Sequence, residues 1–108
     1  MLKILANKYF ELFSKKNIKQ IAEMFAEEII LNDPNVCSIS KTEGLNTTQN
    51  IFNSANTIQI KVKDLYSENR AVVAELEIVI DSNELIRIVD ILKFDDSDKI
   101  ERISAYKM

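Results

Sequence analysis

The sequence predicts an α+β domain in which helices come first and pack on one face of a curved, mostly antiparallel sheet. Two patterns carry this prediction. Apolar residues recur at helical spacing in several segments of the first half of the chain, and from Thr57 onward they alternate with polar residues, as in half-buried strands. A length of 108 residues suits one compact domain, so we expect residues 1–108 to form a single unit.

Three helices are predicted before this change of pattern. Apolar stripes at intervals of three and four residues define the first two, and Asn17 with Gln20 forms an N-cap pair that opens the second. A third helix is predicted from around Asn46 to Ala55. The stripes comprise Leu2, Leu5, Tyr9, Leu12 and Phe13 in the first helix and Ile18, Ile21, Ala22 and Phe25 in the second.

Between the second and third helices we expect a short strand and a loop. Residues 29–33 are predicted to form the strand, which stops at Pro34 because proline biases Asp33 away from helical geometry. Residues 34–46 include Asn, Ser and Gly and are predicted to be irregular.

The second half is predicted to be a meander of four antiparallel strands. Three polar turns, at residues 67–70, 81–83 and 95–98, separate the apolar alternations. Because these connections are short, consecutive strands must run in opposite directions. The expected strands cover 57–66, 71–81, 84–94 and 99–107.

Composition argues against several classes of protein. A net charge of −3 and a pI near 5.0 argue against nucleic-acid binding, and the apolar runs are too short to span a membrane. Cys37 is the one cysteine, so no internal disulfide can form, and the polar N-terminal residues lack a signal-peptide core. We therefore expect a cytoplasmic protein.

The residue inventory also limits the chemistry. Histidine is absent, and the chain has one cysteine and one glycine. These counts exclude His-based catalysis, metal sites built on His or on several Cys, and a Gly-rich phosphate loop. We expect no metal and no cofactor, and any reaction must use carboxylates, Tyr, Lys or Ser/Thr.

The third strand of the meander carries a carboxylate on an apolar face. Ile88, Asp90 and Leu92 share one side of this strand by alternation, and the other members of that side are apolar. A carboxylate placed there loses hydration unless it is paired, hydrogen-bonded or protonated. Two interpretations stay open: a neutral acid that donates a hydrogen bond inside a pocket, or an Asp at the sheet rim or paired with Arg87.

Asp33 and Tyr9 raise the same question. Asp33 shares a strand face with Ile29 and Leu31, which suits a general base at a pocket mouth, but Asp before Pro is also a common turn starter. Tyr9 lies on the buried stripe of the first helix. A buried Tyr is more often a core residue with its hydroxyl satisfied than a catalytic donor.

Five segments spread over nearly the whole chain form a recognisable set: 9–13, 24–28, 31–34, 89–96 and 99–106. In this order they resemble the ketosteroid isomerases. The wider superfamily is the nuclear transport factor 2-like fold, a cone in which helices and a curved sheet surround an apolar pocket. The resemblance implies that fold for this chain.

The resemblance also implies three catalytic roles. By position, Tyr9 and a protonated Asp90 form an oxyanion hole, and Asp33 moves the proton; this mechanism is the family's and is a standard example of carboxylic acids tuned by their surroundings. The implied reaction shifts a C=C bond next to a carbonyl without a cofactor. The implied substrate is a small apolar β,γ-unsaturated ketone, steroidal or otherwise.

Further positions follow from the same resemblance. A flat apolar ligand is expected to contact Phe25 and Phe52, which match family tyrosines that support the catalytic Tyr, together with Ile103 and Ala105 on the last strand. Lys107 stands where the family carries an aromatic residue. Its ammonium either points inward, where it favours ionised Asp90, or lies in solvent.

Two expectations complete the prediction. A non-catalytic module that binds a small apolar ligand in the same fold is the alternative function. A homodimer is expected from the resemblance, formed through the outer sheet face. Several apolar residues on that face would form a patch too large for a monomer to leave exposed to water. The residues assigned to this patch are Val72, Val79, Leu85, Val89 and Ile91.

Overall fold

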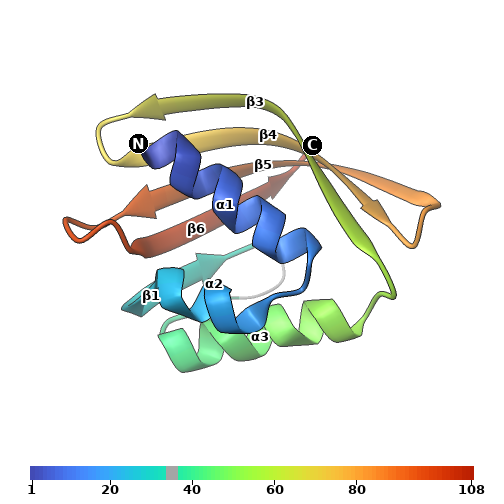
Figure 1. The fold of residues 1–108 in the computed structure, drawn as a ribbon, viewed down its shortest axis with the longest axis horizontal. Helices are drawn as coiled ribbons and strands as arrows, with labels where there is room; N and C mark the ends of the chain where they lie inside the picture. The colour runs from blue at the N-terminus through green and yellow to red at the C-terminus, as the bar shows by residue number, and fades with distance from the viewer. Residues whose placement is uncertain (34–36) are drawn as a thin grey trace.

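A computed structural model describes residues 1–33 and 37–108 (Figure 1). Within these ranges the chain forms three helices and six strands. The helices are α1 (Leu2–Ser14), α2 (Ile18–Met24) and α3 (Lys41–Asn53), and the strands are β1 (Phe25–Asn32), β2 (Cys37–Ser38), β3 (Ile58–Glu68), β4 (Ala71–Ile80), β5 (Glu84–Phe94) and β6 (Ile100–Lys107). The predicted strand stop at Pro34 lies outside the described residues.

All six strands belong to one sheet in the order β2-β1-β6-β5-β4-β3. The meander β3 to β6 is antiparallel, as predicted, and β5 has the predicted bounds. β1 joins β6 in parallel, so the sheet is mixed. Figure 1 shows the sheet curving around α1, which packs on β3 and β4, while α3 packs on β1.

Alternation along β4 and β5 fills the concave side of the sheet. Val72 and Leu76 of β4 and Leu92 of β5 are each no more than 1% exposed, and Tyr9 and Phe10 of α1 pack into the same core. Side chains two residues apart on a strand point to the same face. The same alternation therefore directs the remaining inward positions of both strands toward the space under α1 and α3.

Helix α3 begins at Lys41, five residues before the predicted start at Asn46. Ser40 caps it by accepting a hydrogen bond from the Glu43 backbone N–H at 3.1 Å. The Ser40 to Glu43 spacing is a capping-box signature that the sequence analysis overlooked. By contrast, the predicted cap of α2 is confirmed, because Asn17 Oδ1 accepts from the Gln20 N–H at 3.1 Å.

Strand β1 also begins earlier than predicted. It starts at Phe25, which was assigned to the second helix, rather than at residue 29. Phe25 has extended backbone angles and pairs with Ile100 of β6. This pairing is tertiary, so the local apolar spacing could not show it.

The predicted outer-face patch needs one correction. Val72 is fully buried in the core, because the alternation of β4 places it on the concave side. Leu85 is 52% exposed, and Val79, Val89 and Ile91 are partly exposed. The homodimer itself stays a prediction.

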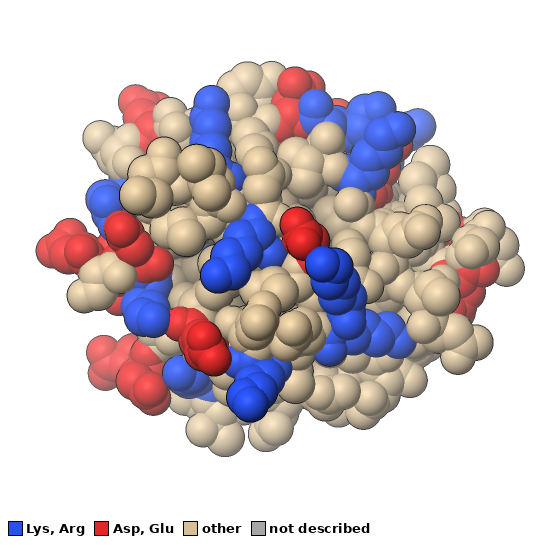
Figure 2. Space-filling model, in the orientation of Figure 1, with Lys and Arg blue, Asp and Glu red and all other residues tan. Residues whose placement is uncertain are grey.

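Charges are mixed over the face that carries α1. Figure 2 shows Lys and Arg side chains interspersed with Asp and Glu across this face. An isolated ion pair of this kind joins Lys15 to Glu11 at 2.9 Å. Within residues 1–33 and 37–108, every helix is too short or too polar to cross a membrane.

Replacing Gly44 by Ala should raise the free energy of unfolding by about 0.5–1 kcal/mol, because Gly inside a helix costs backbone entropy relative to Ala. An added Cβ would meet Leu31 Cδ1 at 3.4 Å and Ile29 Cγ2 at 3.6 Å, which are ordinary contacts. Urea denaturation measures the change. Gly44→Leu, which adds a large side chain at the same contact, should instead lower stability, and a loss of stability in the Ala variant would contradict the assigned packing.

Candidate active site

A mostly apolar cavity of about 230 Å³ lies between α1, α3 and the concave side of the sheet. Its walls come from the inward positions of β3, β4 and β5, with further residues from the two helices and from β1 and β6. Most of the lining is branched aliphatic. The isoleucines that line it are Ile51, Ile58, Ile60, Ile78, Ile80, Ile86, Ile88 and Ile103.

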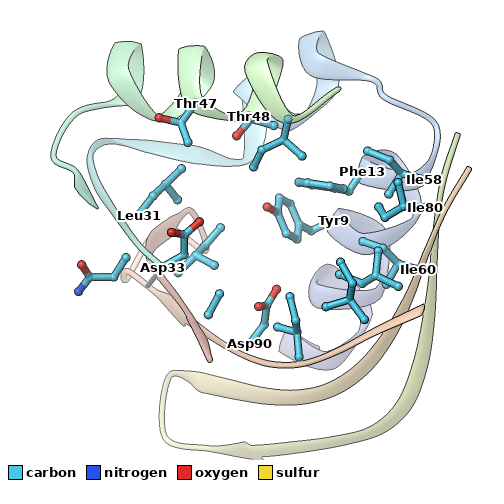
Figure 3. A pocket seen from close by; sticks show the side chains of 17 residues that line it. Tyr9, Phe13, Leu31, Asp33, Thr47, Thr48, Ile58, Ile60, Ile80 and Asp90 are labelled. Carbon is cyan, nitrogen blue, oxygen red and sulfur yellow. The ribbon is translucent and has the colours of Figure 1, made fainter. Parts of the chain in front are cut away.

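Three polar side chains meet in this cavity from distant parts of the chain. Tyr9 comes from α1, Asp33 follows β1 and Asp90 comes from β5. Figure 3 shows the Tyr9 hydroxyl and both carboxyl groups directed toward the same space. The structure therefore brings together all three residues that the resemblance marked as catalytic.

Tyr9 is held by aromatic neighbours. The Tyr9 side chain is 5% exposed, and its ring contacts those of Phe10, Phe13 and Phe25 at centroid distances of 5.5, 5.9 and 6.2 Å. The contacts with Phe10 and Phe13 are edge-to-face and that with Phe25 is tilted, and such ring packing restricts ring orientation. The core thus fixes the direction in which the hydroxyl enters the cavity.

Asp90 is held by the register of three strands. It lies between Ala74 of β4 and Ala105 of β6, and both neighbours are small. Among these strands Asp90 is therefore the longest side chain in its row on the cavity wall. Its carboxyl enters the cavity because the alternation of β5 leaves it no other face.

The surroundings of Asp90 favour its protonated form. Burial, and to a lesser extent the charge of Asp33, raises the pKa of Asp90 from 3.8 to about 7. Burial also raises the pKa of Tyr9, with a smaller contribution from the charge of Asp90. Near neutral pH, a large fraction of Asp90 carries a proton, and Tyr9 keeps its own.

Both groups can serve as donors to a ligand. In the described part of the chain, no hydrogen bond to another protein group occupies the Tyr9 hydroxyl or the Asp90 carboxyl. A phenol and a neutral carboxyl each have one O–H to donate. Two donors that converge in an apolar cavity can stabilise negative charge on a single ligand oxygen.

The predicted ligand contacts divide into two groups. Ile103 and Ala105 line the cavity. Phe25 and Phe52 do not: both are 2% exposed and lie one layer behind the wall, where Phe25 contacts the Tyr9 ring and Phe52 packs edge-on against Phe13 at 4.9 Å. They support the wall residues instead of touching the cavity.

Lys107 adopts the second of its two predicted arrangements. The residue is exposed and is not part of the cavity lining. It pairs with Ile88 near the end of β6, beyond the row that holds Asp90. Its ammonium is therefore not placed to favour ionisation of Asp90.

Helix α3 contributes cavity residues that the sequence analysis missed. Thr47 and Thr48 line the side opposite Asp90 (Figure 3). Thr48 Oγ1 donates to the Gly44 carbonyl at 2.8 Å, and Thr47 Oγ1 is 2.7 Å from Ser38 Oγ. Both threonines lie within the helix predicted from around Asn46 to Ala55, but the sequence analysis did not assign them to the cavity.

The described residues contain no group of three or more His, Cys, Asp or Glu side chains that could hold a metal ion. Asp33 and Asp90 are the two acidic residues of the lining. Carboxyl and phenol groups of this kind can transfer protons and form hydrogen bonds.

Comparisons with known proteins define the family. The model of the SnoaL-like domain matches residues 6–103. The chain belongs to the SnoaL-like domain family. No curated protein sequence matches this SnoaL-like domain.

Solved structures share the fold. A candidate ketosteroid isomerase from Kribbella flavida has a TM-score of 0.86 and 17% identity, with 99% of this chain and 77% of that chain covered. A candidate SnoaL-like polyketide cyclase from Shewanella denitrificans has a TM-score of 0.86 and 11% identity, covering 99% and 90%. An NTF2-like protein of unknown function from Cytophaga hutchinsonii has a TM-score of 0.84 and 12% identity, covering 100% and 90%. These likenesses confirm the predicted nuclear transport factor 2-like fold.

Replacing Asp90 by Asn should raise the free energy of unfolding at pH 8 and change it little at pH 4. A carboxyl with a pKa raised to about 7 keeps its proton in the folded state after the unfolded chain has lost it, so stability falls as pH rises from about 4 to 7. One pKa unit is worth about 1.4 kcal/mol, which puts the full penalty on the order of 4 kcal/mol. Urea unfolding at both pH values measures it.

The matched control is Asp64→Asn, at an exposed position of β3. This variant should follow the wild type at both pH values. If Asp90→Asn also gave no extra stability at pH 8, Asp90 would have to lie in a better-solvated site than the structure shows.

Proposed function

We propose that this SnoaL-like domain is a cofactor-free isomerase that moves the C=C bond of a β,γ-unsaturated ketone into conjugation with its carbonyl. The convergence of Tyr9, Asp33 and Asp90 in one apolar cavity carries the proposal. The match with the SnoaL-like family and the likeness to a candidate ketosteroid isomerase support it.

In the proposed reaction Asp33 acts as the base. Its carboxylate takes a proton from the carbon between the carbonyl and the C=C bond, and the resulting electron pair spreads over a dienolate. The protonated Asp33 then returns that proton to the far carbon of the original double bond. The proton thus moves from the α-carbon to the γ-carbon, the double bond moves from the β,γ to the α,β position, and no other reactant is consumed.

Tyr9 and Asp90 stabilise the dienolate oxygen. Both groups donate hydrogen bonds to it, and an apolar cavity makes each bond stronger than it would be in water. Asp90 can donate only while it is protonated, which its raised pKa of about 7 allows near neutral pH. Two carboxyl groups in one cavity thus take opposite roles, because Asp90 must hold a proton while Asp33 must be ready to accept one.

A non-catalytic ligand-binding module is the second candidate. One observation favours it: the side chains that contact the Tyr9 ring are phenylalanines, so no hydroxyl from them supports the Tyr9 hydroxyl. A module of this kind would bind a ketone through the same two donors without moving a proton. Turnover decides between the two candidates.

Asp33→Asn should abolish conversion of a β,γ-unsaturated ketone to its conjugated isomer, because an amide cannot accept the proton. A general base contributes roughly 10²–10⁴-fold to rate. The rise in ultraviolet absorbance of the conjugated ketone measures conversion, with Asp64→Asn as a control that should retain wild-type rate. Equal rates in wild type and Asp33→Asn would remove Asp33 from the mechanism, and a wild type that binds ketone without converting it would support the binding module.

Tyr9→Phe should lower kcat by about 10²–10³-fold, because one of two donors to the dienolate oxygen is lost. KM should change less, since the donor matters most where the oxygen carries charge. The ring contacts in the core are preserved in this variant, so the midpoint of urea unfolding should stay close to that of wild type. Tyr66→Phe, at a residue that is 61% exposed, serves as the control and should retain full activity.

A further inference from the structure

We infer that the ligand of this cavity is an uncharged aliphatic ketone of one or two rings, with about 6 to 10 carbon atoms, and that a four-ring ketone exceeds the site. The inference rests on the proposed function for the position of the carbonyl. It goes beyond that proposal in naming the size, charge and shape of the substrate.

Cavity volume sets the size. An engineered apolar cavity of about 150 Å³ holds benzene, whereas sites for drug-sized molecules run from about 300 to 1,000 Å³. The present cavity, at about 230 Å³, falls between these. Tyr9, Asp33 and Asp90 stand on different sides of it, so the reacting carbons already take a large share of the space (Figure 3).

The inward face of the sheet determines how a ligand lies in the cavity. Along β5 the inward positions are Asp90, Ile88 and Ile86, and strand geometry puts about 13 Å between the first and last of them. Ile86 pairs with Ile78 of β4, which pairs with Ile60 of β3, so a row of three isoleucines crosses the wall at that distance. A ketone with its oxygen at Asp90 therefore packs its carbon skeleton against these isoleucines, with Ile58 and Ile80 lining the cavity beyond them, and the volume, not the length of the wall, limits the number of rings.

The charge of the lining excludes anionic ligands. Asp33 and Asp90 are the charged residue types in the lining, and none of its described members is Lys or Arg. Lys107, the cation that the sequence placed closest, is exposed and outside the lining. A carboxylate or phosphate on the ligand would enter a low-dielectric site beside Asp33 with no compensating charge.

The chemistry of the walls favours alicyclic over flat aromatic ligands. Apart from the Tyr9 and Phe13 rings, the apolar lining is aliphatic. Isoleucine is stiff at χ1, so a wall built from it has a defined, ridged shape. Such a surface packs against puckered or branched carbon skeletons and offers little face for stacking.

A series of conjugated ketones with one, two and four rings tests this inference. The probes are 2-cyclohexenone, the bicyclic enone 4,4a,5,6,7,8-hexahydro-2(3H)-naphthalenone, and androst-4-ene-3,17-dione. They have the bonding of the product, so binding to the wild-type protein is measured without net turnover. Isoleucine methyl NMR reports the site, with Ile78, Ile86 and Ile88 as sensors and the core residues Ile21 and Ile29, which do not line the cavity, as internal references.

Affinity should rise from one ring to two and then fall at least tenfold for four rings. The second ring adds buried apolar area, whereas the third and fourth exceed the cavity volume of about 230 Å³ and would have to displace side chains of the lining. The sensor methyls should shift and the references should not. A four-ring ketone that binds more tightly than the bicyclic one through the same sensors would overturn the inference.

A wall variant tests the same limit from the protein side. Ile86→Ala opens the isoleucine row and should raise affinity for the four-ring ketone about tenfold or more, while affinity for the bicyclic ketone falls. Ile91→Ala is the matched control, because Ile91 lies on the same strand but its alternation places it on the outer face. It should leave both affinities unchanged, and equal effects of the two variants would count against the assigned wall.

Binding and turnover separate this inference from the proposed function. If the bicyclic ketone binds best but its β,γ-isomer is not converted, the ligand class stands and the isomerase proposal fails. If a four-ring β,γ-ketone is converted faster than the bicyclic one, the isomerase proposal stands and the size limit fails. If none of the three probes shifts the sensor methyls, the ligand class is wrong whatever the turnover assay gives.

Discussion

The burial of one carboxyl group in the concave face of the sheet is the constraint on which the site depends. Asp90 occupies an inward position of β5 between the small residues Ala74 and Ala105, and desolvation is the main reason for its raised pKa. A neutral carboxylic acid is useful as a donor only where water is excluded. The curvature of the sheet and the position of α1 and α3 over it supply that exclusion, so the fold and the protonation state of Asp90 are linked.

The second layer of the core determines how firmly the site is held. Phe25 and Phe52 do not touch the cavity, but they pack behind Tyr9 and Phe13, which do. A side chain whose supporting shell is packed keeps its orientation without a hydrogen bond to its own hydroxyl. Aromatic packing thus fixes the direction of Tyr9 and leaves its hydroxyl for a ligand. Among the described residues no protein group polarises this donor, so the proposed isomerase should be slower than one whose tyrosine is hydrogen-bonded to others.

Most of the site was predictable because its residues follow local periodicity. The alternation of β5 placed Asp90 on the apolar face, and the helical stripe placed Tyr9 toward the core. The start of α3 could also be predicted, because Ser40 and Glu43 have the spacing of a capping box. Gly44 and the polar residues around it instead favoured a loop. What could not be predicted depends on pairing between distant segments. Phe25 belongs to β1 because it pairs with Ile100, 75 positions along the chain, and its place behind Tyr9 follows from that pairing.

The contrast between fold and chemistry in this family has a physical basis. Structures that share this fold at 11–17% identity carry names as different as isomerase and polyketide cyclase. The fold requires apolar residues at most inward positions of the sheet, but it tolerates a polar one wherever the cavity leaves its head group unpacked. Position 90 meets that condition because Ala74 and Ala105 flank it, and position 9 meets it because the ring, and not the hydroxyl, fills the core. Function in this fold is therefore set by a few inward positions next to the cavity, and exchange of one of them changes the chemistry without changing the architecture.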